Sequence, residues 1–236
     1  MPHHKQHNNF IVFFLIIIAI VALGGMLVMG VQDRSTSRSS LSTSKNYSPT
    51  GIQSRPQDFL SANSAAIESP LSFSVGPKDA KVVFVEFFDY QCPYSQIELA
   101  VVRQLMSMYE NASVRFVFRE MPIVKLYPQS INISEGALCA KDQGKYLEYH
   151  DYAFLQQDEI SAESPRTFAE KIGLDMAQFG TCYEQKLHHQ QIVNDLTDAQ
   201  SLGLTGTPTF FINGERIVGA ALFSELKSAI DAAFKK

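Results

Sequence analysis

An unbroken run of apolar residues, FIVFFLIIIAIVALGGMLVM, occupies positions 10–29 of the chain without a single charged side chain. At a rise of about 1.5 Å per residue, a helix of this length matches a bilayer core of about 30 Å. We therefore expect a short flank over residues 1–9 and a transmembrane anchor over residues 10–31. A cleaved signal peptide is the alternative, but its apolar region is normally about 7–15 residues long and ends in an A-x-A-like site, which this run lacks.

The pattern changes at residue 32, where a polar stretch rich in serine and threonine begins and continues to residue 69. Its composition predicts a flexible linker between the anchor and a folded domain. Lysine and arginine do not fix the orientation of the anchor. Lys5 precedes the apolar run but Arg34, Arg38 and Lys45 follow it, so the positive-inside rule does not favour an exported carboxyl terminus.

From residue 70 onward the pattern predicts an α/β domain. Residues 81–88, KVVFVEFF, are typical of a strand buried on both faces, and residues 114–119 give a second strand. Between them a short loop leads into a predicted helix, and Pro93 suits the first turn of that helix. Strand, helix and strand in this order predict a parallel βαβ unit. The predicted buried stripe of the helix consists of Ile97, Val101, Leu105 and Met108.

The second half of this domain begins with a helical block over about residues 129–202. Strands at 209–212 and 216–218 then flank Asn-Gly, a strong signal for a β-hairpin, and a last helix closes the chain. Residues 70–236 therefore predict an α/β fold interrupted by a helical insertion. The composition, with 45% hydrophobic and 19% charged residues and a net charge of −4, excludes a disordered chain and a strongly basic nucleic-acid binder.

The chain has three cysteines, Cys92, Cys139 and Cys182, an odd number that leaves at least one thiol unpaired in an exported protein. Cys92 lies between a buried strand and a helix N-terminus, where free N–H groups favour the thiolate and lower a cysteine pKa. The thiolate is the attacking species in disulfide exchange. The alternative for Cys92 is a buried, unreactive cysteine, which is common.

Three segments carry a resemblance to a known family: VEFFDYQCPYS, AKDQGKYLEYHDYAF and TGTPTFFING. Together they resemble the thioredoxin superfamily and, within it, the DsbA-like thiol–disulfide oxidoreductases. The resemblance implies a thioredoxin fold with a helical insertion and Cys92 as an exposed nucleophile. It places the cis-proline of the family at Pro208, after Thr207, with Pro93 and Tyr94 beside the client.

The resemblance also implies roles for three residues away from the motif. Glu86 matches an acidic residue that relays protons near the active-site cysteine; the alternative is that strand alternation turns it outward. Cys139 and Cys182 occupy positions where some relatives carry a structural disulfide, although two buried thiols are the alternative. A structural disulfide requires an oxidising compartment, so the domain is expected outside the cytoplasm.

Ser95 departs from the family motif, Cys-Pro-x-Cys, at its second cysteine. A serine cannot resolve a mixed disulfide, although its hydroxyl could donate a hydrogen bond to the Cys92 thiolate. Three explanations stay open: Cys92 acts as a monothiol, Cys139 or Cys182 resolves the mixed disulfide, or Ser95 is a laboratory substitution that traps it. We favour the monothiol.

The sequence therefore predicts a membrane-anchored, extracytoplasmic thiol–disulfide exchange protein. The partners it implies are exported proteins with cysteines, together with a membrane or small-thiol redox partner. The alternative function is non-catalytic client binding by a thioredoxin fold that lost its second active-site cysteine. No cofactor and no nucleic acid are expected. No metal site is expected either, because Glu184, His188 and His189 are more typical of a polar helix surface.

Overall fold

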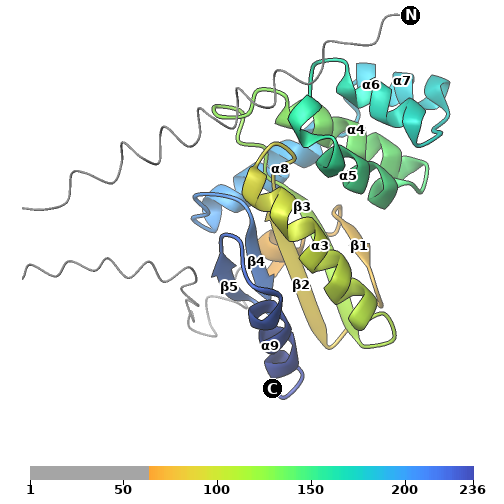
Figure 1. Ribbon diagram of the computed structural model, residues 1–236. Helices are drawn as coiled ribbons and strands as arrows, with labels where there is room; N and C mark the ends of the chain where they lie inside the picture. Colours follow the sequence, from red (N-terminus) through yellow and green to blue (C-terminus); the bar gives the residue numbers. More distant parts are fainter. Residues whose placement is uncertain (1–63) are drawn as a thin grey trace, which may run out of the picture. The chain divides into compact units, whose positions relative to one another are not determined.

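The computed structural model describes residues 64–236 (Figure 1). The predicted anchor at residues 10–31 and most of the predicted linker lie outside these residues. Among the helices of residues 64–236, none has the length and hydrophobicity that a membrane span requires.

A single five-stranded sheet organises the described part of the chain. Its strands are β1 (Phe73–Val75), β2 (Val82–Phe88), β3 (Val114–Glu120), β4 (Thr209–Ile212) and β5 (Glu215–Val218), in the order β1-β3-β2-β4-β5. Strands β2 and β3 run parallel, as predicted, and the other three pairings are antiparallel. The turn between β4 and β5 has a positive φ at Asn213 and at Gly214, which explains the Asn-Gly pair in the sequence.

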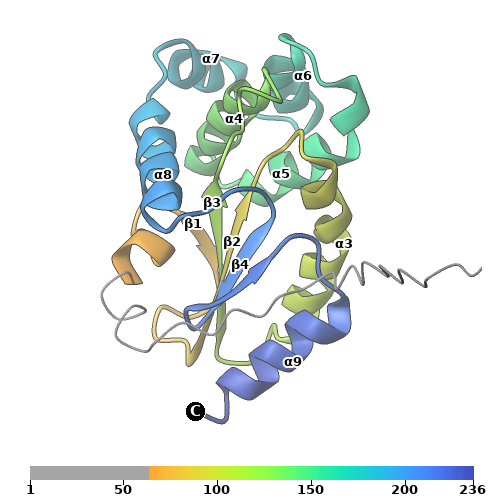
Figure 2. The ribbon, with the colours of Figure 1, turned by 90° about the vertical axis from the view of Figure 1, so that its left-hand side faces the viewer.

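Helices cover both faces of the sheet (Figure 2). Helices α3 (Pro93–Met108) and α9 (Phe223–Ala233) lie on one face, and α8 (His189–Ser201) lies on the other. The insertion between β3 and β4 also contains α4 (Ser130–Asp142), α5 (Tyr146–Leu155), a 3-10 turn η1 (Gln157–Glu159), α6 (Ser164–Lys171) and α7 (Met176–Glu184). The result is a thioredoxin-like α/β fold with a helical insertion.

Two hydrophobic cores follow from the alternation of side chains along β2. Phe84 and Phe88 point into the larger core, which continues through α3, α9 and the insertion. Val85 and Phe87 point into the smaller core beneath α8. Because β2 is covered on both faces, its sequence is an almost continuous apolar run, and Glu86 is the one polar residue in it.

The folded domain begins earlier than the predicted boundary at residue 70. Residues 64–68 are helical, and Ile67 is buried in the smaller core, so this end of the predicted linker is packed structure. Arg119 holds it in place by donating hydrogen bonds to the carbonyls of Ala66 and Ile67. Strand β1 was not predicted, because three residues give too little alternation to identify a strand.

The predicted buried face of α3 is wrong by a partial rotation of the helix. Ile97 is 60% exposed and Met108 is 49% exposed. Of the predicted stripe, Leu105 is buried and Val101 packs partly buried against the core. The buried positions of the helix are Ser95, Glu98, Val102 and Leu105. Hydrophobic periodicity could not find this stripe because two of its four members are polar, and each of them bonds to a backbone N–H in the interior.

Candidate redox site

Cys92 is the N-cap residue of α3, directly after the loop that follows β2. Cys92 has an extended backbone conformation, with φ of −77° and ψ of 119°, and Pro93 begins the helix. The backbone therefore changes from extended to helical at Cys92. The carbonyl of Cys92 accepts the first hydrogen bond of the helix, from the Gln96 N–H. The sequence therefore places this thiol at a helix N-terminus, as predicted.

The loop before β4 lies against the Cys92 thiol. The Thr207–Pro208 peptide bond is cis, and the Cys92 thiol donates a hydrogen bond to the Thr207 carbonyl over 3.3 Å. This contact corrects one expectation. The nucleophile was expected to be exposed, whereas Cys92 is only 4% exposed because the loop covers it. Pro93 and Tyr94 are exposed and form the outer rim of the site.

Ser95 is buried one helical turn after Cys92, and its hydroxyl forms a hydrogen bond with Asp89. The hydroxyl accepts from the Asp89 N–H at 3.4 Å. The expected hydrogen bond from the Ser95 hydroxyl to the Cys92 sulfur is not among the hydrogen bonds of residues 64–236. Within the described chain, the thiol of Cys92 is hydrogen-bonded to Thr207 instead.

Asp89 fixes the loop that carries Cys92, a role that the sequence analysis missed. Its backbone carbonyl accepts from the Cys92 N–H at 3.1 Å. Burial raises the pKa of its carboxyl above the usual value, against the lowering effect of the hydrogen bonds that it accepts. The donors to this carboxylate are the N–H groups of Gln91 (2.7 Å) and Ile123 (2.6 Å) and the hydroxyl of Ser130 (2.5 Å). Asp89 thereby joins the site to the start of the insertion.

Glu86 is buried on the side of β2 that faces α3, not turned outward. Its pKa is raised from 4.5 to about 8, mainly by burial and next by the Glu98 carboxylate, against a smaller lowering effect of Arg103. Glu98 was not predicted as a site residue. Burial raises its pKa to about 7, although the Ala221 N–H donates to it. The core beneath α3 therefore holds two carboxyl groups that can exchange protons near neutral pH.

A second contact between the helical insertion and the active-site loop runs through the amide side chain of Gln157. Gln157 donates hydrogen bonds from Nε2 to the carbonyls of Tyr90 (2.7 Å) and Cys92 (3.1 Å). Gln96 of α3 donates in return to the Phe154 carbonyl of α5. Nothing in the sequence distinguished Gln157 from other polar residues, because its contacts depend on how the insertion folds back.

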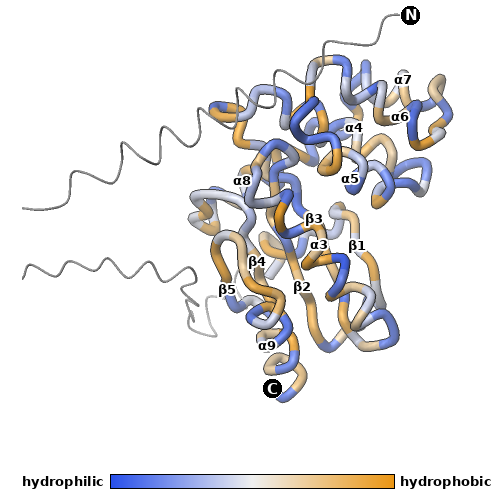
Figure 3. Tube along the Cα trace, in the orientation of Figure 1, coloured by the Kyte–Doolittle hydropathy of each residue, from blue (hydrophilic) through white to orange (hydrophobic). Residues whose placement is uncertain are grey.

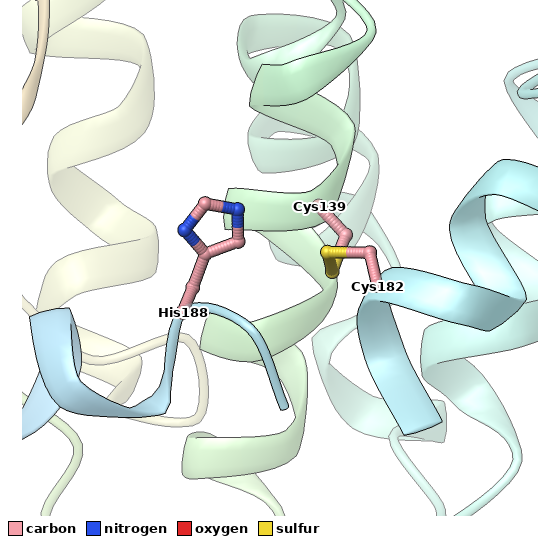
Figure 4. Close-up of side chains that lie close together, drawn as sticks. All are labelled: Cys139, Cys182 and His188. Carbon is pink, nitrogen blue, oxygen red and sulfur yellow. A yellow bond between two sulfur atoms is a disulfide. The ribbon is translucent and has the colours of Figure 1, made fainter. Parts of the chain in front are cut away.

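Cys139 and Cys182 form a disulfide that joins α4 to α7, with Cα atoms 5.8 Å apart. Figure 4 shows a ring nitrogen of His188 turned toward this bond. Because both sulfurs are bonded to each other, neither is available as a thiol while the pair stays oxidised. Cys92 is then the free cysteine of residues 64–236. Of the other polar residues considered in the sequence, His189 pairs with Glu135 and Glu184 with Arg166.

Comparisons with known proteins agree with this geometry. A family model described as Thioredoxin matches residues 68–232. The thiol-disulfide exchange protein alpha-DsbA2 of Wolbachia pipientis is 26% identical, with a TM-score of 0.67 over 74% of this chain and 94% of that one. A thioredoxin-like oxidoreductase from Silicibacter pomeroyi DSS-3 is 31% identical, with a TM-score of 0.62 over 73% of this chain and 98% of that one.

Curated relatives match over a smaller share of their own length. The Na(+)/H(+) antiporter NhaA 3 of Salinispora tropica is 34% identical over 159 residues, which are 67% of this chain and 24% of that protein. The chain therefore spans about a quarter of the length of such relatives.

Fold and site together define a thioredoxin-fold redox protein with a thiol at a helix N-terminus, opposite a cis-proline. The chain belongs to the thioredoxin family, and within that superfamily to the DsbA-like thiol–disulfide oxidoreductases.

Proposed function

We propose that this chain is a membrane-anchored, extracytoplasmic protein that exchanges disulfides through the single thiol of Cys92. The observation that carries the proposal is the position of the Cys92 sulfur, at the N-terminus of α3 and in contact with the Thr207 carbonyl before the cis-proline. An extended client segment that lies beside Pro208 would bring its own sulfur to Cys92 by displacing this contact.

Isomerisation by this route needs no net electron transfer, whereas reduction of a client disulfide takes two electrons from small thiols. The Cys92 thiolate attacks one sulfur of a client disulfide, and a Cys92–client bond forms as the client disulfide breaks. The second client sulfur leaves as a thiolate and takes up a proton. A different client thiolate, or a small thiol, then attacks the mixed disulfide and releases Cys92. With a client thiol the outcome is isomerisation. With a small thiol the client is left bonded to that thiol, and a second small thiol must attack this bond to complete the two-electron reduction, which leaves a disulfide of the two small thiols.

Ser95 and the Cys139–Cys182 bond support single-thiol chemistry. Ser95 has no sulfur, so it cannot resolve the mixed disulfide, and the other two cysteines are bonded to each other in α4 and α7. Glu86, with a pKa raised to about 8 by burial, is the group in this core that we assign to proton uptake and release during exchange.

Location outside the cytoplasm is supported by the Cys139–Cys182 disulfide, because such bonds persist in oxidising compartments. The apolar run at residues 10–29 is the proposed membrane anchor. Exported proteins with cysteines are the proposed clients, and a membrane protein or small thiol is the proposed redox partner. Ion antiport is not part of the proposal, because the match covers about a quarter of the antiporter relatives.

The burial of Cys92 and the serine at position 95 favour a second candidate, a protein that binds clients without turnover. Reactivation of a test protein with scrambled disulfides, in glutathione buffer, separates the two functions. We expect the full-length chain to accelerate reactivation, Cys92→Ala to abolish the effect, and Ser95→Cys to add oxidation of reduced clients.

Ser107→Cys is the matched control for Ser95→Cys, because it adds an exposed thiol at the far end of the same helix. It should behave like the wild type. Reactivation by Cys92→Ala as fast as by the wild type would refute the exchange function and leave client binding.

A further inference from the structure

Cys139, Cys182 and His188 form a cluster of metal-ligating groups away from Cys92. Their sulfur and nitrogen atoms all lie within 4.8 Å of one another (Figure 4). Asp142, the last residue of α4, adds a fourth group. Its Oδ2 is 2.7 Å from His188 Nε2 and 3.8 Å from Cys182 Sγ. The proposed function of Cys92 uses none of these four residues.

The four groups match the coordination chemistry of Zn²⁺. Zinc favours tetrahedral sets of thiolate, imidazole and carboxylate ligands, at about 2.3 Å from sulfur and about 2.0–2.2 Å from nitrogen or oxygen. Tetrahedral angles then separate neighbouring ligand atoms by about 3.3–3.8 Å. His188 Nε2 and Asp142 Oδ2 need to separate by less than about 1 Å from their hydrogen-bonded distance to reach this range. Once the disulfide is broken, side-chain rotation can separate the two sulfurs.

Three elements meet at this cluster, and each supplies at least one ligand. Cys139 and Asp142 lie one helical turn apart near the end of α4, Cys182 lies in α7, and His188 precedes α8. Both cysteines are buried, whereas Asp142 is partly exposed, which gives an ion a way in from solvent. A metal here would join the same two helices that the disulfide joins.

We propose that the reduced Cys139–Cys182 pair, with His188 and Asp142, forms a Zn²⁺ site. In the first step a dithiol reductant gives up two electrons and two protons, becomes a disulfide itself, and converts the Cys139–Cys182 bond into two thiols. In the second step Zn²⁺ binds, and the two thiols release their protons. Zinc and the disulfide are alternative links between α4 and α7, so the insertion stays folded in either redox state.

The sequence pattern predicted no metal site at Glu184, His188 and His189. Only His188 of those three belongs to the cluster. The proposed zinc site is independent of the proposed exchange function, because Cys92 supplies no ligand. The zinc site can therefore be tested in a variant that lacks Cys92.

The test uses the full-length chain carrying Cys92→Ala, reduced with a phosphine and then titrated anaerobically with Co²⁺ as a spectroscopic probe. Tetrahedral thiolate coordination gives strong visible absorption and a sulfur-to-cobalt charge-transfer band. We expect both in the reduced protein, saturating at one equivalent, bleached by one equivalent of Zn²⁺, and missing from the oxidised protein.

Two neighbouring histidines provide a matched pair of variants. His188→Gln should weaken Co²⁺ binding at least about tenfold, since loss of a ligand or its support costs about 10–100-fold in affinity. His189→Gln, whose histidine pairs with Glu135, should bind like the parent. No tetrahedral band in the reduced protein, an equal band in the oxidised protein, or equal weakening by both histidine variants would overturn the proposal. Far-UV circular dichroism of each variant distinguishes lost coordination from lost folding.

Discussion

Replacing Glu86 by glutamine isolates the energetic consequence of burying a carboxyl group in β2. The glutamine keeps the size and hydrogen-bonding capacity of the protonated acid but cannot ionise. In the folded protein burial raises the pKa of Glu86 to about 8, from an ordinary value of 4.5. Between these two pH values the folded chain keeps a proton on Glu86 that the unfolded chain has released.

The sign and size of the effect follow from proton linkage. Because the folded state binds more protons, the Glu86 contribution to stability is fully present below pH 4.5 and is lost as the pH rises toward 8. Each pH unit in this window corresponds to about 1.4 kcal/mol, so the whole rise corresponds to at most about 5 kcal/mol. Glu86→Gln removes this loss and should be more stable than the wild type at pH 8, with a much smaller difference at pH 5.

Urea unfolding of both proteins at half-unit steps from pH 5 to pH 8.5 gives the difference in unfolding free energy. Other buried carboxyl groups, such as Glu120, largely cancel in this difference because both proteins contain them. Glu110→Gln is the control, since Glu110 is exposed in the turn that follows α3. A difference between Glu86→Gln and the wild type that stays constant over this pH range would refute the reasoning.

Two further predictions concern the links that hold the insertion and the amino-terminal segment. Replacing both Cys139 and Cys182 by alanine, in chelator, should lower the unfolding free energy by about 4 kcal/mol in the chain-entropy model; equal urea midpoints would contradict this. Arg119→Ala should cost about 3–5 kcal/mol, because it leaves Asp195 buried without its cation. Proteolysis should then cut near residues 64–68, and an unchanged digestion pattern would contradict that contact.

The sequence was most informative where one residue type is required by local geometry. The cis-proline at Pro208 was implied by the family resemblance, whereas the start of α3 at Pro93 and the Asn213–Gly214 turn followed from their residues alone. The sulfur at the strand-to-helix junction was identified in the same way. These features depend on backbone conformation within a few residues, so a single sequence is enough to predict them.

The features that the sequence did not reveal depend on contacts between distant segments. In the sequence Asp89 has the features of an ordinary loop residue. Its role depends on folding, which brings the Ile123 N–H and the Ser130 hydroxyl to its carboxylate. From the sequence Glu98 would be assigned to the exposed face of a helix, although it is buried and accepts a hydrogen bond from the Ala221 N–H. The burial of Cys92 depends on the Thr207 loop, which is remote in the sequence. Periodicity cannot identify a buried position that a polar residue occupies.

The most direct test of the central claim is mass spectrometry of the full-length chain after reaction with a disulfide-containing client peptide. We predict a single mixed disulfide, formed at Cys92 and persisting because Ser95 cannot resolve it. It should disappear in Ser95→Cys and be absent from Cys92→Ala. A client attached at Cys139 or Cys182, or no adduct with the wild type, would contradict single-thiol exchange at Cys92.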